Sequence, residues 1–386
     1  MRLTKKALTV LLAILISSGQ FCFAAKQDLI FSGIYEAALD LPRIYFLIKR
    51  DTDSRSSNRQ QEMKVHYAFL DTGASGILLS NETAEGLGVK LDANARYVDV
   101  GVGGTEYFKV SEPLNICLAS FASQNPENQN IYKCFGPWRV QVKRESAGLL
   151  SEPIDVIGMP AMVGNVVVLN SGATNSLGYF AADIKKENDP KIPKMDFKVA
   201  LQLKKFTNPK DKRNVGPLPV SGNNPVIDRV VVSFNGRRSE GSWLLDTGAT
   251  VSMISTRQAK KLGLVNQNGQ PLAKVAFSVP VGGIGQMTMI NGFEVDRMTI
   301  PMMGGYNIIF KNARIGVHDI KYFDVEKKTE VVIDGILGSN FLCASAKMDN
   351  LLPSDIGETP FENIVIDLRE NTLGFDVRDN LQQPQK

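Results

Sequence analysis

Two stretches, AFLDTGASGILLS at residues 68–80 and WLLDTGATVSMIS at residues 243–255, set the same Asp-Thr-Gly-Ala tetrapeptide between apolar runs. Asp and Gly are common turn residues, and Thr is common in strands. A single copy would therefore indicate only a turn between two strands. Because the tetrapeptide recurs in the same apolar setting, turn formation alone is a poor explanation for Asp71 and Asp246.

The repeat continues past the tetrapeptide in a constant register. Matching Ser, Ala, Leu and Gly residues follow each Asp, namely Ser80, Ala84, Leu87 and Gly88 in the first copy and Ser255, Ala259, Leu262 and Gly263 in the second. Each set predicts a short helix with a Ser cap, one apolar face, and a Gly able to take the left-handed closing conformation.

Other segments also occur once in each half. VGVGGTEYFKV at residues 100–110 and VPVGGIGQMTM at residues 279–289 each predict a β-hairpin with a Gly-Gly turn. An apolar-apolar-Gly segment follows, ending at Gly158 in the first half and at Gly338 in the second. Both halves close with a strand-turn-strand pattern. We interpret the chain as two copies of one β-rich unit.

This repeat sets the expected domain organisation. We expect a signal peptide at residues 1–24, a first lobe at 25–183, a linker at 184–223 and a second lobe at 224–386. The linker is rich in Lys, Pro, Asn and Gly, although FKVALQLKKF within it alternates well enough to form a strand that joins the lobes. Residues 51–64 are polar and predict a surface loop.

The first residues predict export. Arg2, Lys5 and Lys6 precede an apolar run, and small residues suited to cleavage lie near Ala24 and Ala25. The alternative is an uncleaved membrane anchor, but roughly a dozen apolar residues is short for a span of about 20. We therefore expect a periplasmic or secreted protein with no stable membrane anchor after cleavage.

Charge and cysteine content exclude other classes. A formal net charge of +4 gives no strong basic bias, so we expect no nucleic-acid partner. With no CxxC motif and two histidines in the chain, a structural zinc is disfavoured, and we expect no metal or cofactor. An oxidising compartment would allow Cys117 and Cys134 to pair and close a short polar loop, while Cys343 is interpreted as a small buried apolar residue.

Two equivalent Asp residues in homologous lobes can be brought face to face. Adjacent carboxylates share a proton and titrate as a pair, one with a low apparent pKa and one with a raised pKa. Such a pair can activate water toward an amide carbonyl. Gly73 and Gly248 would allow close backbone approach. Thr72 and Thr247 could link the two loops through their hydroxyl groups, and Gly158 and Gly338 could pack against these loops.

With these motifs in order, the sequence resembles the pepsin and retropepsin superfamily of aspartic proteases, in its single-chain form with two retropepsin-like halves. The resemblance runs from about residue 40 to 377 and rests on two sets of matching segments: AFLDTGA, VGVGG and VIGMPAM, then WLLDTGA, VGGIG and ILGSNFL. It implies an all-β, bilobal, pepsin-like fold, with two β-barrel lobes, short helices and a cleft between the lobes. It also implies that Asp71 and Asp246 form the catalytic pair.

The same resemblance makes the two Gly-bearing hairpins flap candidates, around Gly103, Gly104, Gly282, Gly283 and Ile284. Tyr107 is the counterpart of the flap Tyr of pepsins, although Tyr in such a strand often only packs. Ala74 and Ala249 stand where pepsin-like enzymes often carry a hydroxyl residue, which leaves the pH optimum open.

Two functional hypotheses follow. The first is an exported aspartic endopeptidase that hydrolyses a peptide or protein substrate, working as a monomer whose lobes form one site. The second is a non-catalytic peptide- or protein-binding or inhibitory module that retains the fold, since one fold can serve several functions. In either case a cleft between β lobes suggests an extended peptide held by main-chain hydrogen bonds. Cleavage specificity is not fixed by the sequence.

Overall fold

The structure is a computed structural model of the 386-residue chain. It describes residues 27–32, 34–38, 40–49, 64–144, 154–174, 180–207, 210–220, 223–343 and 359–378. The expected signal peptide and most of the expected loop at residues 51–64 lie outside these ranges. Strands account for 52% of the structure and helices for 8%, which confirms the predicted all-β class.

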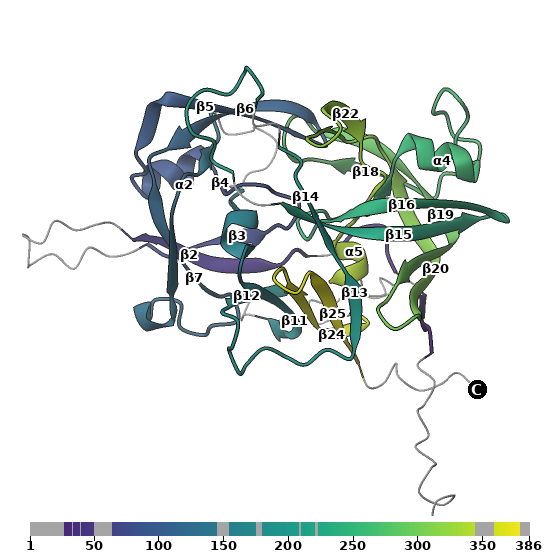
Figure 1. The fold of residues 1–386 in the computed structure, drawn as a ribbon, viewed down its shortest axis with the longest axis horizontal. Helices are drawn as coiled ribbons and strands as arrows, with labels where there is room; N and C mark the ends of the chain where they lie inside the picture. The colour runs from purple at the N-terminus through teal and green to yellow at the C-terminus, as the bar shows by residue number, and fades with distance from the viewer. Residues whose placement is uncertain are drawn as a thin grey trace, which may run out of the picture.

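Most of the first half lies on the left of Figure 1, in purple to blue, while its N-terminal strand, Leu29–Ser32, lies beside the strand Asn307–Val317 of the second half. Its elements are β1 (Leu29–Ser32), β2 (Arg43–Lys49), β3 (His66–Leu70), β4 (Leu78–Leu79), α2 (Asn81–Gly86), β5 (Leu91–Gly101), β6 (Gly104–Ser111), β7 (Leu114–Ser120), the 3₁₀ turn η1 (Gln129–Ile131), β8 (Lys133–Trp138), β9 (Gln141–Val142), β10 (Val156–Ile157), α3 (Met159–Met162), β11 (Val166–Thr174) and β12 (Phe180–Lys185).

The linker and the second half follow (Figure 1). Their elements are β13 (Phe197–Ala200), β14 (Gln202–Lys204), β15 (Asn224–Phe234), β16 (Arg237–Leu245), β17 (Met253–Ile254), α4 (Thr256–Leu262), β18 (Phe277–Val281), β19 (Thr288–Pro301), β20 (Asn307–Val317), β21 (Lys321–Asp324), β22 (Thr329–Val332), β23 (Gly335–Leu337), α5 (Ser339–Leu342), β24 (Phe361–Asp367) and β25 (Thr372–Val377).

The second half contains a closed six-stranded barrel. Its strands pair in the order β20-β17-β23-β16-β15-β19, and β19 also pairs with β20 to close the ring. The hairpin between β15 and β16 turns at Asn235-Gly236, where both residues have positive φ (47° and 73°), as a tight Asn-Gly hairpin requires. Inward-facing side chains such as Trp243, Phe293 and Phe310 fill the core.

The first half builds the same ring from shorter pieces. Pro113 separates β6 from β7, which together occupy the place of the single strand β19. Similarly, β8 and β9 together take the place of β20. The ring then runs β2-β3-β10-β4-β9, and returns through β8 and β7 to β2. Proline supplies no N–H to the ladder, so a strand break at this position is expected.

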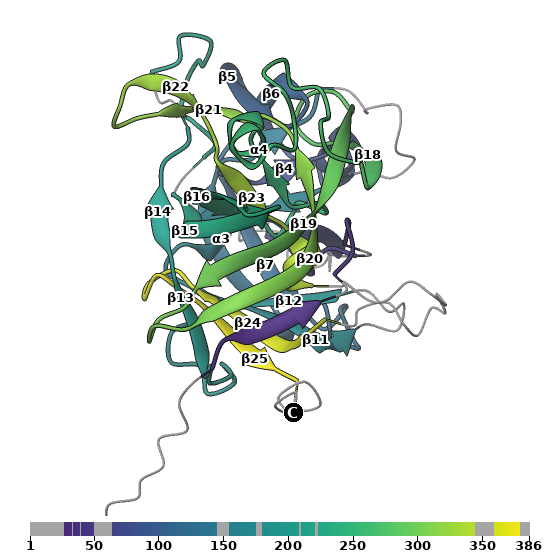
Figure 2. The same ribbon diagram turned by 90° about the vertical axis from the view of Figure 1, so that its right-hand side faces the viewer.

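Strands cross between the halves at both ends of the chain. The C-terminal hairpin β24–β25 extends the 14-stranded sheet of the first half by pairing with β11. Conversely β1, the purple strand in Figure 2, pairs in parallel with β20 of the second half. The linker segment predicted to join the lobes does so, because β13 pairs with β25 and β14 pairs with β15, in the other sheet.

The helices end as their sequences predict. Ser80 and Ser255 are the N-caps of α2 and α4, and their hydroxyls accept hydrogen bonds from Thr83 N–H and Gln258 N–H. Gly263 closes α4 at φ 75°. Among the described residues, no helix is long and apolar enough to cross a membrane.

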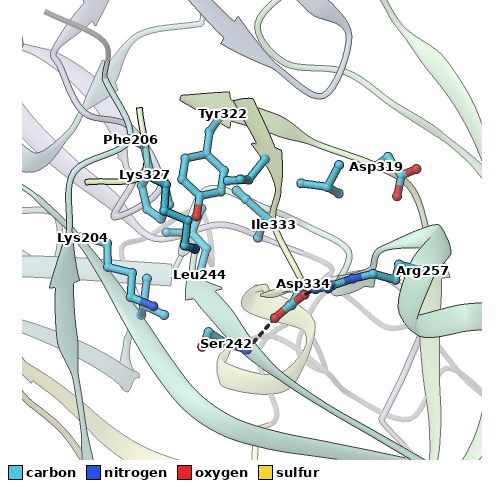
Figure 3. A pocket seen from close by; sticks show the side chains of 13 residues that line it. Lys204, Phe206, Ser242, Leu244, Arg257, Asp319, Tyr322, Lys327, Ile333 and Asp334 are labelled. Carbon is cyan, nitrogen blue, oxygen red and sulfur yellow. Dashed lines mark hydrogen bonds and ion pairs between the residues drawn. The ribbon is translucent and has the colours of Figure 1, made fainter. Parts of the chain in front are cut away.

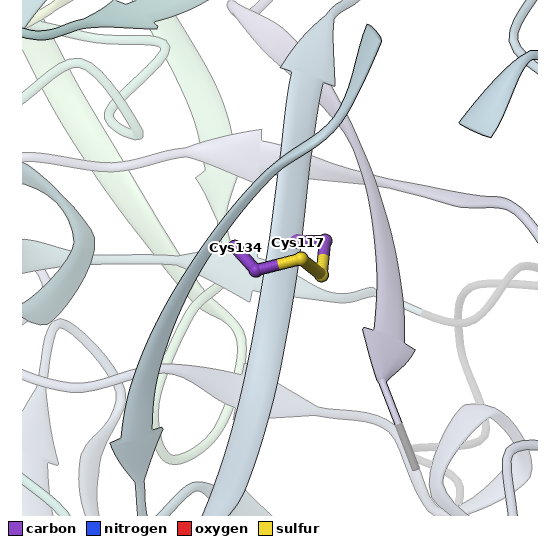
Figure 4. Close-up of a disulfide and its surroundings, with 2 residues drawn as sticks. All are labelled: Cys117 and Cys134. Carbon is purple, nitrogen blue, oxygen red and sulfur yellow. A yellow bond between two sulfur atoms is a disulfide. The ribbon is translucent and has the colours of Figure 1, made fainter. Parts of the chain in front are cut away.

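The expected disulfide is present. Cys117 on β7 and Cys134 on β8 lie directly opposite each other and are bonded (Figure 4). The bridge lies near the loop end of the β7–β8 hairpin and closes the loop that carries η1. Cys343 has a free thiol and is buried at the end of α5.

Candidate active site

Each Asp-Thr-Gly-Ala loop follows a barrel strand. Asp71 comes directly after β3, and Asp246 comes directly after β16. The Asp71 amide donates to the carbonyl of Ile157 at 3.0 Å, and the Asp246 amide donates to Leu337 at 3.0 Å. These acceptors lie at the ends of β10 and β23, which run parallel to β3 and β16. The parallel pairing brings each apolar-apolar-Gly segment under its loop.

Gly158 and Gly338 follow these acceptors and lie against the loops. A Cβ on Gly158 would overlap the carbonyl oxygens of Ala74 and Gly76, and one on Gly338 would crowd the carbonyl of Ala249. One residue further on, the amides of Met159 and Ser339 donate to Ala74 and Ala249 at 2.9 and 2.8 Å. Glycine is therefore needed at both positions because of close backbone approach.

The two Asp side chains lie face to face and hydrogen-bond to each other. A Cβ on Gly73 would overlap the Asp246 carboxyl group, and a Cβ on Gly248 would overlap that of Asp71. Thus each glycine leaves room for the opposite carboxylate. The structure brings together residues that lie 175 positions apart in the chain.

Backbone N–H groups surround both carboxyl groups. Oδ1 of Asp71 accepts from the amides of Gly73 (2.7 Å) and Ala74 (3.1 Å). Oδ1 of Asp246 accepts from the equivalent amides of Gly248 and Ala249, each at 3.0 Å. The alanines thus contribute through their backbone, although their side chains offer no hydroxyl group.

The threonine hydroxyls link the two loops in a symmetric pattern. Thr72 Oγ1 donates to the carbonyl of Leu245 at 2.6 Å and accepts from the Thr247 amide at 3.1 Å. Thr247 Oγ1 donates to the carbonyl of Leu70 at 2.6 Å and accepts from the Thr72 amide at 3.1 Å. Both threonines are fully buried, so all four bonds lie out of water. The relative position of the two Asp residues is fixed by these bonds.

Burial raises the pKa of both carboxyl groups. The effect is larger for Asp246, whose pKa stands well above its usual range because burial is reinforced by the adjacent Asp71 carboxylate. For Asp71, hydrogen bonds from Asp246 and from backbone amides oppose the rise in pKa. We expected one low and one raised pKa, but desolvation moves both upward. The two carboxyl groups therefore titrate as a pair, and the rise in pKa is greater for Asp246.

The pair lies on the floor of a cleft of about 1290 Å³. The tips of the two Gly-bearing hairpins, β5–β6 and β18–β19, line the same cleft at Gly101, Val102 and residues 282–287. The cleft wall is completed by linker residues such as Phe206 and Asn214. Both lobes and the linker therefore enclose one shared space.

The tips of the two hairpins are hydrogen-bonded to each other. Gly103 N–H donates to Ile284 and the Gly103 carbonyl accepts from Gln286 N–H, both at 3.0 Å. In addition, Gly285 N–H donates to Glu106 Oε2 at 3.1 Å. Gly285 has φ 92° and no room for a Cβ beside Gly103. The glycines of both turns were predicted from the sequence. Neither the pairing of the two hairpin tips nor the hydrogen bond from Gln286 N–H was predicted.

Tyr107 lies elsewhere. Its side chain is 41% exposed, and the guanidinium of Arg144 lies 5.5 Å from the centre of its ring. On this hairpin the tyrosine that lines the cleft is Tyr97 on β5, which is buried and hydrogen-bonded to Asp99 and Thr207. Tyr107 on β6 pairs with Val98, the neighbour of Tyr97 on β5. Because neighbouring residues of a strand face opposite ways, the register of the hairpin places the two tyrosines on opposite faces.

Two further residues hold the Asp-Thr-Gly-Ala loops and were not predicted. Asn224 is fully buried, and its Nδ2 donates to the carbonyls of Thr72 and Gly73, both at 2.9 Å. Ser339 Oγ donates to the carbonyl of Thr247 at 2.7 Å. Asn224 opens β15 in the second half, so no pattern local to the first motif could have identified it.

A smaller pocket of about 430 Å³ adjoins the cleft behind Phe206 and Tyr322, which contribute to both spaces (Figure 3). Its charged residues are already paired. Arg257 lies against Asp334, which also accepts from Ser242 N–H at 3.2 Å. We find no chemistry for this pocket. Within the described part of the chain, no group of three or more His, Cys, Asp or Glu side chains could hold a metal ion.

Comparison with known proteins identifies the second half. Residues 230–341 match the family model described as aspartyl protease. Over this segment the expected resemblance to aspartic proteases is confirmed. The aspartyl protease segment includes Asp246, Thr247 and Gly338, while Asp71 lies outside it.

Other comparisons add less. A crystal structure of an aspartic proteinase from Irpex lacteus shares 10% sequence identity with the chain, and the match covers 91% of this chain and 100% of that one at a TM-score of 0.46. No curated protein sequence matches the chain.

Proposed function

We propose that the protein is an exported aspartic endopeptidase that hydrolyses peptide bonds with a water molecule activated by Asp71 and Asp246. The observation that carries the proposal is the pair of carboxyl groups that meet at the cleft, held in register by the symmetric bonds of the buried threonines. The aspartyl protease match over residues 230–341 supports the same class of function. Both lobes of one chain supply the site, so a monomer suffices.

In this proposal Asp246, whose pKa is raised further, is taken as the protonated member of the pair. Asp71, the ionised partner, accepts a proton from the water as it attacks the substrate carbonyl carbon. Asp246, the protonated partner, donates a hydrogen bond to the carbonyl oxygen, keeps its proton, and so stabilises the tetrahedral intermediate. The proton taken up by Asp71 then passes to the leaving amine, the C–N bond breaks, and the pair returns to its single-proton state. Backbone amides that bind each Oδ1 keep the groups oriented through the cycle.

Cleavage of an unfolded protein across about pH 3–7, with and without pepstatin, tests this proposal. Asp71→Asn and Asp246→Asn are each expected to lower kcat by at least about 10³-fold, because either change removes the shared-proton pair. Asp228→Asn, a partly exposed change on β15, is the matched control and should keep activity.

Two outcomes would contradict the mechanism. If either Asp variant cleaves as fast as the wild type, the pair is not the catalytic group. If the folded wild type binds peptide but never cleaves it at any pH, the binding-module hypothesis replaces the enzyme.

A further inference from the structure

Part of the linker lies along the edge of the flap strand β5. Arg96 N–H donates to the Val215 carbonyl at 2.8 Å, and Val215 N–H donates back to the Arg96 carbonyl at 2.9 Å. Two residues further along β5, Val98 N–H donates to the Asn214 side chain at 2.9 Å. The linker thus occupies the side of β5 that does not pair with β6 (Figure 1).

The same linker segment also reaches the loop that follows Asp71. Val220 forms an antiparallel bridge with Gly76, five residues after Asp71. A Cβ on Gly76 would meet the Pro219 carbonyl oxygen at 2.9 Å, so the two backbones are in close contact. Leu218 and Val220 pack into the apolar cluster beneath β5. We call residues 211–220 the strap.

The strap lies along the edge of β5, whose backbone groups an extended peptide would need as hydrogen-bond partners. A peptide that adds to a sheet edge bonds to every second residue of that edge. Arg96 and Val98 of β5 bond outward to the strap. Since every second residue faces the same edge, Val100 is the next outward-facing residue. The strap uses both backbone groups of Arg96 and the N–H of Val98. The Val100 N–H donates to Asp99 Oδ1 at 2.9 Å, so a peptide can pair only with the carbonyls near the tip of β5, those of Val98 and Val100.

The strap also forms part of the cleft wall at this end. Asp211, Arg213 and Asn214 line the cleft together with Val98 and Val100. Arg213 is held in place by ion pairing with Asp211, with contacts of 2.6–3.1 Å, and its carbonyl accepts from Arg96 Nε at 3.3 Å. This part of the cleft wall is therefore a segment that is hydrogen-bonded to β5.

We propose that the strap takes the place of a substrate strand and closes one end of the cleft, so that substrates extend freely on only one side of the scissile bond. This inference rests on the proposed peptidase function and narrows its substrate class. Near the tip of β5 the outward-facing carbonyls of Val98 and Val100 remain, since both N–H groups already donate to side chains, and one strand residue in two pairs outward. Binding on the closed side should therefore end after about four peptide residues.

A length series of non-hydrolysable reduced-amide peptides tests the proposal, extended one residue at a time on either side and measured by fluorescence anisotropy. On the side away from the strap, each pair of added residues should lower Kd by about fivefold, the effect of about one main-chain hydrogen bond. On the other side, Kd should stop falling after about four residues. Equal gains on both sides would overturn the proposal.

A strap variant sharpens the test. Asn214→Ala combined with Val215→Pro removes the acceptor for Val98 N–H and the donor to the Arg96 carbonyl. This double variant should regain the length dependence on the closed side, while the exposed strap change Lys212→Ala should behave as wild type. An unchanged length dependence in a folded double variant contradicts the proposal.

Hydrogen exchange provides a readout in the wild type that does not depend on the folding of a variant. The Val215 amide should stay protected when an extended peptide binds. Loss of its protection would show that the peptide displaces the strap, which would overturn the proposal. Binding of these peptides does not require turnover, so the two proposals can fail separately. If the length dependence differs between the two sides but no substrate is cleaved, only the proposed peptidase function is wrong. If substrates are cleaved but the length dependence is equal on both sides, only the strap proposal is wrong.

Discussion

The two halves build the same barrel and support their Asp-Thr-Gly-Ala loops in different ways. The second half uses two long strands, β19 and β20, where the first half uses four shorter strands interrupted at Pro113 and at residues 139–140. In the second half Ser339 of the same lobe holds the Thr247 carbonyl, whereas in the first half Asn224 from the opposite lobe holds the Thr72 carbonyl. The more interrupted half thus relies on the other half to position its Asp.

Reliance also runs in the opposite direction. Ala38, near the N-terminal strand β1, donates its N–H to the Thr250 carbonyl of the second loop at 2.7 Å. Asn340 of α5 donates to the carbonyls of Tyr35 and Glu36 and so ties this N-terminal segment to the second half. The two repeats are therefore homologous units that do not hold their loops independently, because each loop accepts a hydrogen bond from a residue outside its own repeat.

The largest expected effect comes from breaking the symmetric link between the loops. Thr72→Val and Thr247→Val keep the side-chain volume but each leaves a buried carbonyl and a buried amide without a partner. Each should lower the free energy of unfolding by about 3 kcal/mol, since both groups lose their hydrogen bonds out of water. Denaturant titration measures this loss, and Thr105→Val on the exposed edge of the flap should change stability by no more than about 0.5 kcal/mol. A large difference between the two buried variants would show that the link is not symmetric.

The next effect separates the two modes of loop support. Asn224→Asp replaces the donor Nδ2 by an oxygen that faces two carbonyl oxygens, so we expect kcat to fall about 100-fold at neutral pH, equivalent to about 2.7 kcal/mol. Acidification should restore part of this activity, because a protonated carboxyl group can donate one hydrogen bond. Ser339→Ala removes a single bond and should cost about tenfold at every pH. The ratio of variant to wild-type kcat across the pH range is the measurement, and the absence of recovery at low pH in a folded Asn224→Asp variant would argue against a positioning role for Asn224.

The smallest effect concerns Asp99, for which the second half has no equivalent carboxylate on β18. Burial raises the pKa of Asp99 to about 6, although Val100 N–H, Gln141 and Tyr97 donate to it. Between about pH 4 and 6 the folded chain therefore holds a proton that the unfolded chain has released, so stability falls as pH rises through this window. Asp99→Asn removes the penalty and should raise the free energy of unfolding by about 1 kcal/mol at pH 7, with no gain at pH 4.

Denaturant titration at the two pH values checks the prediction for Asp99. The matched control is Asp92→Asn on the same strand, which loses an ion pair with Arg139 at 2.8 Å. Its effect should have the opposite sign, a loss of up to about 1 kcal/mol at pH 7. If Asp99→Asn lowers stability equally at both pH values, its hydrogen bonds outweigh the cost of burying its charge.

Much of the site was predictable because repetition supplied a second, independent copy of each signal. Spacing from the two Asp residues indicated the helices with their Ser caps, the hairpins with their Gly turns, and the glycines packed under the loops. Tyr107 shows where this reasoning ended. Its position in the hairpin was clear from the sequence, but the face it occupies depended on a strand register that the sequence did not specify.

By itself, the sequence determined the β-rich repeat, the two Asp residues and the need for glycine beside them, since these follow from local pattern and from residue size. Only the tertiary structure decided which groups meet across the repeat: the threonine bonds between loops, Asn224 against Thr72, the paired hairpin tips, and the strap along β5. These contacts join residues far apart in the chain, and their partners are mostly backbone groups. Because every residue carries the same backbone donor and acceptor, no sequence pattern distinguishes the ones that pair.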